Sequence, residues 1–136
     1  MFLNMLNEQE KQEYLNLVVL AAHINGVLED EEKIMIRGYQ REMGLTNDAI
    51  PVCSELDEAS VFRGFSESEV SHKKIVLFEL IGLLLCDNEY DEDETRFVIR
   101  FCDAAGMPLD EAETISQLAV RYFNVITEIA ESIFTV

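Results

Sequence analysis

Apolar residues recur every three to four positions over most of this chain, and no segment alternates with the period of two that marks a strand. The spacing predicts helices throughout. Asn25-Gly26 interrupts the pattern early in the chain, and Gly44 and Gly106 each end the helix that follows a corner. We therefore expect an all-α, single-domain protein over residues 1–136. The expected helices cover about residues 7–24, 29–43, 48–58, 66–86, 92–105 and 110–134.

Three helix starts carry a capping-box pattern, in which a polar N-cap residue is followed three positions later by a glutamate. These pairs are Asn7 and Glu10, Ser66 and Glu69, and Asp110 and Glu113. Asn47 is the expected cap of the third helix, with Pro51 in its first turn, and residues 59–65 are expected to form a connector. The last helix is amphipathic throughout. Its apolar positions are Ile115, Leu118, Ala119, Tyr122, Phe123, Ile126, Ile129 and Ile133.

The chain also repeats itself. Residues 14–48 match residues 76–110 without a gap, at a constant offset of 62 positions. Asn25-Gly26 falls on Asp87-Asn88, and the acidic segment 29–32 falls on the acidic segment 91–94. A duplicated unit fixes the architecture. We expect about six helices in two pseudo-symmetric repeats, residues 8–58 and 67–134.

The net charge of −17 limits the classes of partner. Nucleic acids and anionic membrane surfaces are disfavoured because binding them requires clusters of lysine and arginine. The longest apolar run, residues 75–86, is interrupted by Glu79 and is too short to span a bilayer. No signal peptide is evident, and three cysteines without a C-x-x-C motif fit a reducing cytoplasm. Cations and basic protein surfaces remain as partners.

Each corner places a polar residue at the end of one helix and a glutamate seven positions later, in the first turn of the next helix. Oxygen-rich clusters of this kind suit Ca²⁺ or Mg²⁺. The same acids also serve as helix caps and complement the helix dipole, so a helix start without metal is the alternative. The second corner is the stronger metal candidate because it is more acidic. The candidate metal ligands are Asn25, Glu29, Glu32, Asp87, Asp91 and Glu94.

Other known metal-binding and catalytic motifs are incomplete or absent in the sequence. An EF-hand loop starting at Asp87 would place Glu92 at the turn glycine and Val98 at the bidentate glutamate. Glu69-x-x-His72 has the spacing of a di-iron ligand pair but has no second copy, so His72 is expected on a solvated face. His23 is expected to be partly buried and hydrogen-bonded. No nucleophile elbow or phosphate-binding glycine loop occurs, and we expect no enzyme.

The two corners resemble the TerB-like family, named for bacterial tellurite resistance. The shared pattern is a helix ending in Asp-Gly, then a hydrophobic residue, a capping residue and a glutamate seven positions after the aspartate. The resemblance extends from about Leu15 to Met107. The first corner keeps Gly26 but has Asn25 for the acid, whereas the second keeps Asp87 but has Asn88 for the glycine. The resemblance implies an all-helical fold, metal binding by the corner acids, and a role in stress response or beside DnaJ-type co-chaperones.

We therefore expect a non-enzymatic binding or regulatory module, linked to a divalent cation held by the Asp87–Glu94 cluster. The alternative is a metal-free acidic scaffold that binds a basic protein partner.

Overall fold

The computed structural model describes residues 1–26, 28–46, 49–86 and 91–135. These residues form six α-helices and two short 3-10 turns, with no strand among them, so the predicted all-α fold is confirmed. No helix in the described ranges is both long and apolar enough to cross a membrane. The helices are α1 (Glu8–Ala22), α2 (Asp30–Glu42), α3 (Glu58–Arg63), α4 (Val70–Leu84), α5 (Glu92–Ala104) and α6 (Leu109–Phe134), and the 3-10 turns are Leu3–Met5 and Cys53–Glu55.

Four helices follow the repeat in the sequence. The bounds of α1 and α4 differ by 62 positions at both ends, and so do those of α2 and α5. Asn7 caps α1 through the predicted capping box, in which its side chain accepts from the Glu10 amide at 2.8 Å. Gly44 and Gly106 have positive φ just beyond α2 and α5, as expected of residues that end helices. The pseudo-twofold relation of the two units in space stays a prediction.

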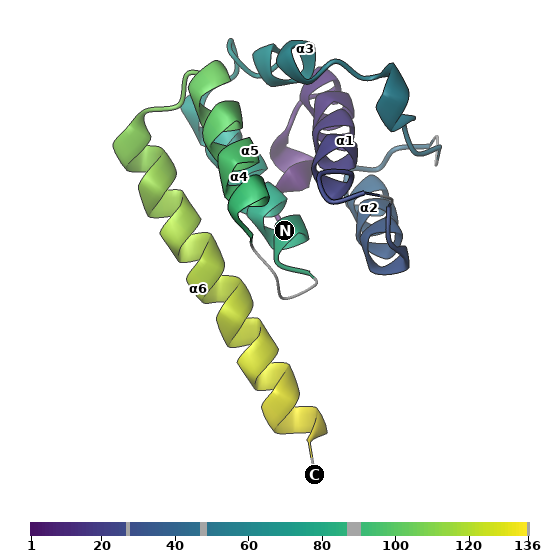
Figure 1. Ribbon diagram of the computed structural model, residues 1–136, viewed down its shortest axis with the longest axis vertical. Helices are drawn as coiled ribbons and strands as arrows, with labels where there is room; N and C mark the ends of the chain where they lie inside the picture. The colour runs from purple at the N-terminus through teal and green to yellow at the C-terminus, as the bar shows by residue number, and fades with distance from the viewer. Residues whose placement is uncertain (27, 47–48, 87–90, 136) are drawn as a thin grey trace.

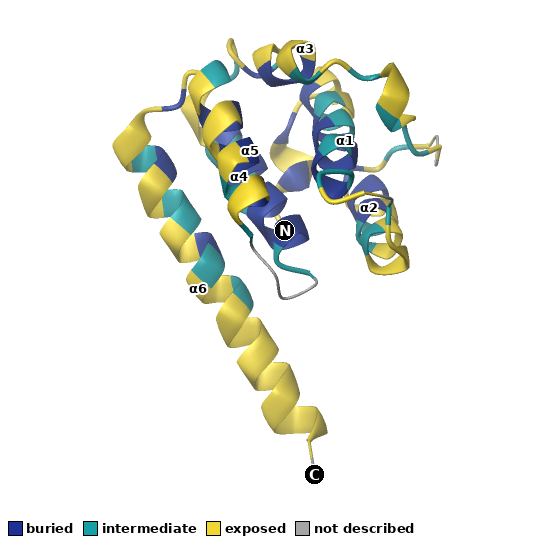
Figure 2. Ribbon diagram, viewed as in Figure 1, coloured by how far each residue is buried: buried dark blue, intermediate teal, exposed yellow. Residues whose placement is uncertain are grey.

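Helix α4 is the centre of the packing. It contacts α1, α5 and α6 (Figure 1), and the buried residues of all six helices belong to one core (Figure 2). Its one interior acid, Glu79, is buried, and it accepts from the Met1 amino group at 2.7 Å and from the Phe2 amide at 3.2 Å. The N-terminal segment therefore neutralises the charge that interrupts the longest apolar run of the sequence.

The third helix was predicted wrongly. Residues 49–52 are not helical, α3 covers part of the expected connector, and the expected cap Asn47 and first residue Asp48 lie outside the described residues. Pro51 disfavours a helical conformation of the residue before it. Asp57 instead caps α3 by accepting from the Ser60 amide at 3.0 Å. Phe62 and Phe65 then pack edge to face against Phe101 of α5.

Two helix starts also differ from the prediction. Helix α4 begins after Glu69, whose side chain makes no capping bond, and the Ser66 amide donates to the Arg63 carbonyl in a turn before the helix. Helix α6 begins at Leu109, after Pro108, so Asp110 lies in its first turn and does not cap it. Pro108 is the N-cap, and its side chain makes no capping bond.

One histidine was predicted correctly and the other was not. His23 is partly buried and its Nδ1 lies 2.8 Å from the Val19 carbonyl oxygen, as expected. His72 is not simply solvated, because its Nδ1 lies 2.8 Å from Oε1 of the buried Glu10. Burial alone would raise the pKa of Glu10, but hydrogen bonds from Ser68, the Asn7 amide and His72 hold it below its usual range. Glu10 thus joins α1 to the start of α4.

The contribution of Glu10 to stability is expected to disappear in acid. Because its pKa is lowered on folding, its stabilisation is present above the unfolded pKa of 4.5 and is lost as the pH falls through the folded pKa. Urea denaturation of the wild type and Glu10→Gln from pH 7 to pH 3 measures this. The difference in free energy of unfolding should shrink towards pH 3, and a constant difference would contradict the prediction.

Candidate functional site: the two acidic corners

The first corner connects α1 to α2. Gly26 lies in this corner with φ of 125°, a conformation that other residues adopt at a cost in strain. Glu29 is the N-cap of α2, and its amide donates to Oε1 of Glu32 at 3.0 Å as part of a capping box. The two candidate ligands Glu29 and Glu32 are therefore brought together, and they stabilise the start of a helix.

The second corner connects α4 to α5 and repeats this arrangement. Asp91 is the N-cap of α5, and its Oδ1 accepts from the Glu94 amide at 2.8 Å. The Asp91 amide donates to Oε1 of Glu94 at 3.3 Å, and Glu94 is only 5% exposed. The candidate ligand Asp87 lies outside the described residues. Asp91 and Glu94 are thus engaged in a second capping box.

The two corners touch each other. Nδ2 of Asn25 donates to Oδ2 of Asp91 at 2.8 Å, across 66 positions of sequence. Both carboxylate oxygens of Asp91 therefore accept hydrogen bonds, one from its own corner and one from the other. An aspartate at position 25 would place a second negative charge against Asp91, whereas the amide of Asn25 supplies a donor. The amide of Asn25 therefore joins the two corners.

The charge of Asp91 is favoured by these contacts. The Glu94 amide has the largest effect and lowers the pKa of Asp91, slight desolvation opposes it, and the Asn25 amide lowers it further. Asp91 stays ionised at neutral pH in the middle of the joined corners.

The geometry brings together some of the predicted ligands and not others. Asn25, Asp91 and Glu94 form one hydrogen-bonded set, and Glu29 and Glu32 form another. Within the part of the chain that the structure describes, no three aspartate, glutamate, histidine or cysteine side chains are placed to hold a metal ion.

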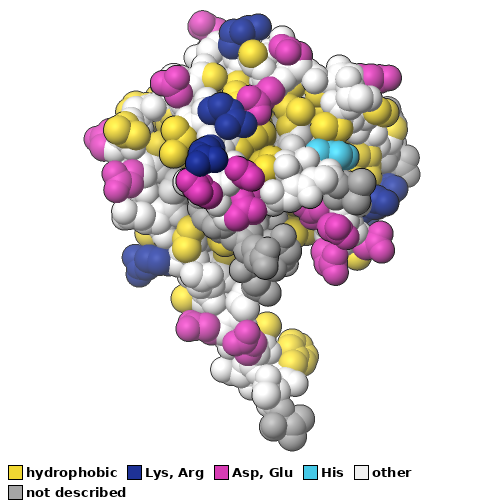
Figure 3. All heavy atoms as spheres, viewed as in Figure 1, with side chains coloured by type: hydrophobic (Ala, Val, Ile, Leu, Met, Phe, Trp, Pro, Cys, Tyr) yellow, Lys and Arg dark blue, Asp and Glu magenta, His cyan; other side chains and the backbone are white. Residues whose placement is uncertain are grey.

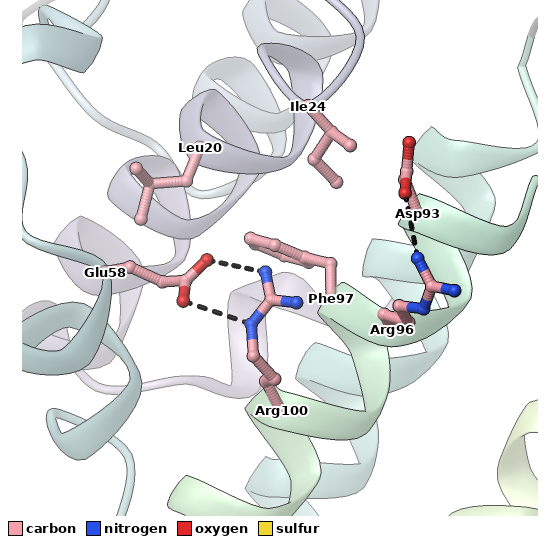
Figure 4. Close-up of a pocket in the computed structure, with 7 residues that line it drawn as sticks. All are labelled: Leu20, Ile24, Glu58, Asp93, Arg96, Phe97 and Arg100. Carbon is pink, nitrogen blue, oxygen red and sulfur yellow. Dashed lines mark hydrogen bonds and ion pairs between the residues drawn. The ribbon is translucent and has the colours of Figure 1, made fainter.

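A cleft of about 390 Å³ lies beside the corners, between α1, α3 and α5 (Figure 4). The sequence did not predict this cleft. Arg100 crosses it and forms a two-point ion pair with Glu58, at 2.9 and 3.2 Å. Arg96 lies at the corner side and bonds Glu92 at 2.6 Å and Asp93 at 3.3 Å. The spacing of Arg96 and Arg100 behind the acidic turn was the available signal for a charged face, but the partner of Arg100 on α3, Glu58, has no local signature in the sequence.

The bond between the corners is expected to couple Asn25 and Asp91 energetically. Asn25→Ala, Asp91→Ala and the double variant form a cycle, and the double variant should lose less free energy of unfolding than the sum of the single variants, because both remove the same hydrogen bond. Asn25→Ala paired with Asp57→Ala, which removes the distant cap of α3, is the control and should be additive. Additivity of the Asn25 and Asp91 changes would show that the corners are not joined in solution.

Comparisons of the chain with protein-family models, with curated proteins and with solved structures found no match. The TerB-like resemblance therefore depends on the residues of the two corners, and the interpretation of the site depends on their geometry.

Proposed function

We propose that this chain is a non-enzymatic binding module whose joined corners present an acidic surface to a basic protein partner. The observation that carries the proposal is the Asn25–Asp91 hydrogen bond, because it joins the corner before α2 to the N-cap of α5. The first turn of each of these helices contains acids that take no part in a capping box.

Each helix has two of these acids, which we call the outward acids. Asp30 and Glu31 are exposed on α2, and Glu92 and Asp93 are exposed on α5. Arg96 offsets part of the charge on α5, whereas the net charge of the whole chain is −17. Figure 3 shows acidic side chains on the face viewed, with fewer basic ones among them. Such a field attracts and orients a basic partner.

A module linked to a divalent cation is the alternative proposal. It is favoured by the contact of Asn25 with Asp91, which brings together one candidate ligand from each corner. It would require the capping carboxylates to use some of their oxygen lone pairs to coordinate the ion. The resemblance to the TerB-like family supports this form, and it supports a stress-associated role for either form.

The test uses a short peptide rich in lysine and arginine as the basic probe. The variant neutralises the four outward acids together (Asp30→Asn, Glu31→Gln, Glu92→Gln, Asp93→Asn). The matched control removes the same charge from exposed acids elsewhere (Glu55→Gln, Glu67→Gln, Glu69→Gln, Glu113→Gln). Fluorescence anisotropy at low and high salt gives the affinities, and circular dichroism confirms that both variants stay helical.

The corner variant is expected to bind the peptide about tenfold more weakly than the control variant, and the wild-type affinity should fall steeply with salt. Equal affinities of the two variants would mean that only the total charge matters, which would overturn the assignment of the surface to the corners.

A further inference from the structure

The last three turns of α6 extend beyond the rest of the protein. Residues 124–135 are all exposed, and in Figures 1 and 2 this end of the helix projects from the body. An isolated helix of this length is marginal in water, and most helical stability in proteins comes from packing. A surface that covers this segment would therefore stabilise it.

The exposed segment carries an apolar stripe. We define the α6 stripe as Leu118, Tyr122, Val125, Ile126, Ile129 and Ile133, of which Leu118, Val125 and Ile129 are each 48% exposed and Ile133 is 66% exposed. Spacings of three and four place these residues along one side of the helix, next to the side that packs on α4. The last helix is thus amphipathic as predicted, and much of its apolar side is exposed.

The α6 stripe continues onto the body of the protein. The Tyr122 ring lies 5.7 Å from Phe78 of α4, and Phe78 lies 5.9 Å from Phe2, which is 43% exposed. The apolar surface therefore combines helix and body, and contiguous apolar surfaces of this kind mark interaction sites.

We propose that a second copy of this chain covers the α6 stripe, with the two α6 helices antiparallel. The distribution of charge favours this pairing. Residues 115–136 contain only Arg121, Glu128 and Glu131 as charged residues, a net charge of −1 in a chain of −17. Two strongly acidic copies repel each other over most of their surfaces, but they can approach along this weakly charged part of α6. The centres of protein interfaces are depleted of charge in the same way.

The register of the stripe also favours an antiparallel pair. An antiparallel pair centred between Val125 and Ile126 places Leu118 opposite Ile133 of the second copy and Tyr122 opposite Ile129 of the second copy. Every apolar residue of the stripe then faces an apolar residue.

The same register is complementary in charge. Arg121 and Glu128 lie on one edge of the stripe, and in this register each Arg121 is two positions, about 3 Å at 1.5 Å per residue, from directly opposite Glu128 of the second copy. The long arginine side chain can span that offset, so the pair forms twice by symmetry. Within the described residues, neither Arg121 nor Glu128 forms an ion pair in the single chain. The stripe is roughly 22 Å long at 1.5 Å per residue. An interface of this size predicts a reversible dimer with Kd on the order of 1–100 μM.

Sedimentation velocity of the 136-residue chain over a concentration series tests the association. The wild type should shift from monomer to dimer, and Ile129→Lys should weaken the dimer at least about tenfold by placing two charges in its apolar centre. Ile99→Lys is the matched control, since Ile99 is also a highly exposed isoleucine (61%) but lies on α5. A wild type that stays monomeric throughout, or equal effects of the two substitutions, would overturn the proposal.

A charge reversal tests the antiparallel register. Arg121→Glu and Glu128→Arg should each weaken the dimer, and the double variant should recover the wild-type affinity within about twofold, because the pairing is restored with opposite sign. A double variant no stronger than the single variants would overturn the antiparallel pairing. The outcome is independent of the proposed function, because none of the corner acids takes part.

Discussion

Phe101→Ala is expected to lower the free energy of unfolding by about 3–5 kcal/mol, the largest effect of any substitution considered. Phe101 is fully buried on α5, and its ring lies 5.7 Å from that of Phe62 and 5.6 Å from that of Phe65. Removing it leaves a cavity between α5 and the segment that joins the two repeat units. Urea denaturation followed by circular dichroism measures the loss.

Ile99→Ala is the matched control on the same helix. Ile99 is 61% exposed, so its loss should change the free energy of unfolding by less than about 1 kcal/mol. Similar costs for the two substitutions would show that α3 and α5 do not share the core as described.

Gly82→Ala is expected to destabilise the protein by about 1–3 kcal/mol, even though alanine is the better helix former. A Cβ at this position would lie 2.5 Å from the ring of Phe123, so α6 must move away from α4 to accept it. Thermal and urea denaturation measure the change. Phe123→Leu in the same chain should recover part of the loss, because the shorter side chain removes the clash.

Gly38→Ala is the control for helix propensity. Gly38 lies within α2, and nothing lies within 4 Å of a Cβ added there, so this substitution should stabilise the protein by about 0.5–1 kcal/mol. Equal effects at Gly38 and Gly82 would contradict the close contact of α4 with α6.

The helices that the sequence predicts well are those whose ends depend on neighbouring residues. Asn7, Glu29 and Asp91 start their helices as expected because an N-cap side chain bonds an amide only three positions away. Helix α3 was not predicted because Phe62 and Phe65 pack against Phe101 of α5. Local spacing does not reveal a contact between residues this far apart in the sequence. Asp57-x-x-Ser60 was the local signal that could have located it.

The candidate site shows the same limit. The repeat located both corners and their glutamates, yet the contact between Asn25 and Asp91 joins residues 66 positions apart and has no local signature. Asn25 was therefore interpreted as a weakened ligand, whereas it is a hydrogen-bond donor between the corners. Apolar spacing likewise predicted an amphipathic last helix, but spacing cannot show that Val125 and Ile129 remain 48% exposed.

Calorimetric titration of the basic peptide into the wild-type protein, once in EDTA and once with Ca²⁺ and Mg²⁺, tests the central claim most directly. The joined corners are predicted to bind the peptide with the same affinity in both conditions, because their capping carboxylates already have hydrogen-bond partners. Peptide binding that requires the divalent ions, or heat from the ions alone that Asp91→Asn with Glu94→Gln abolishes, would contradict this account and favour the cation-linked module.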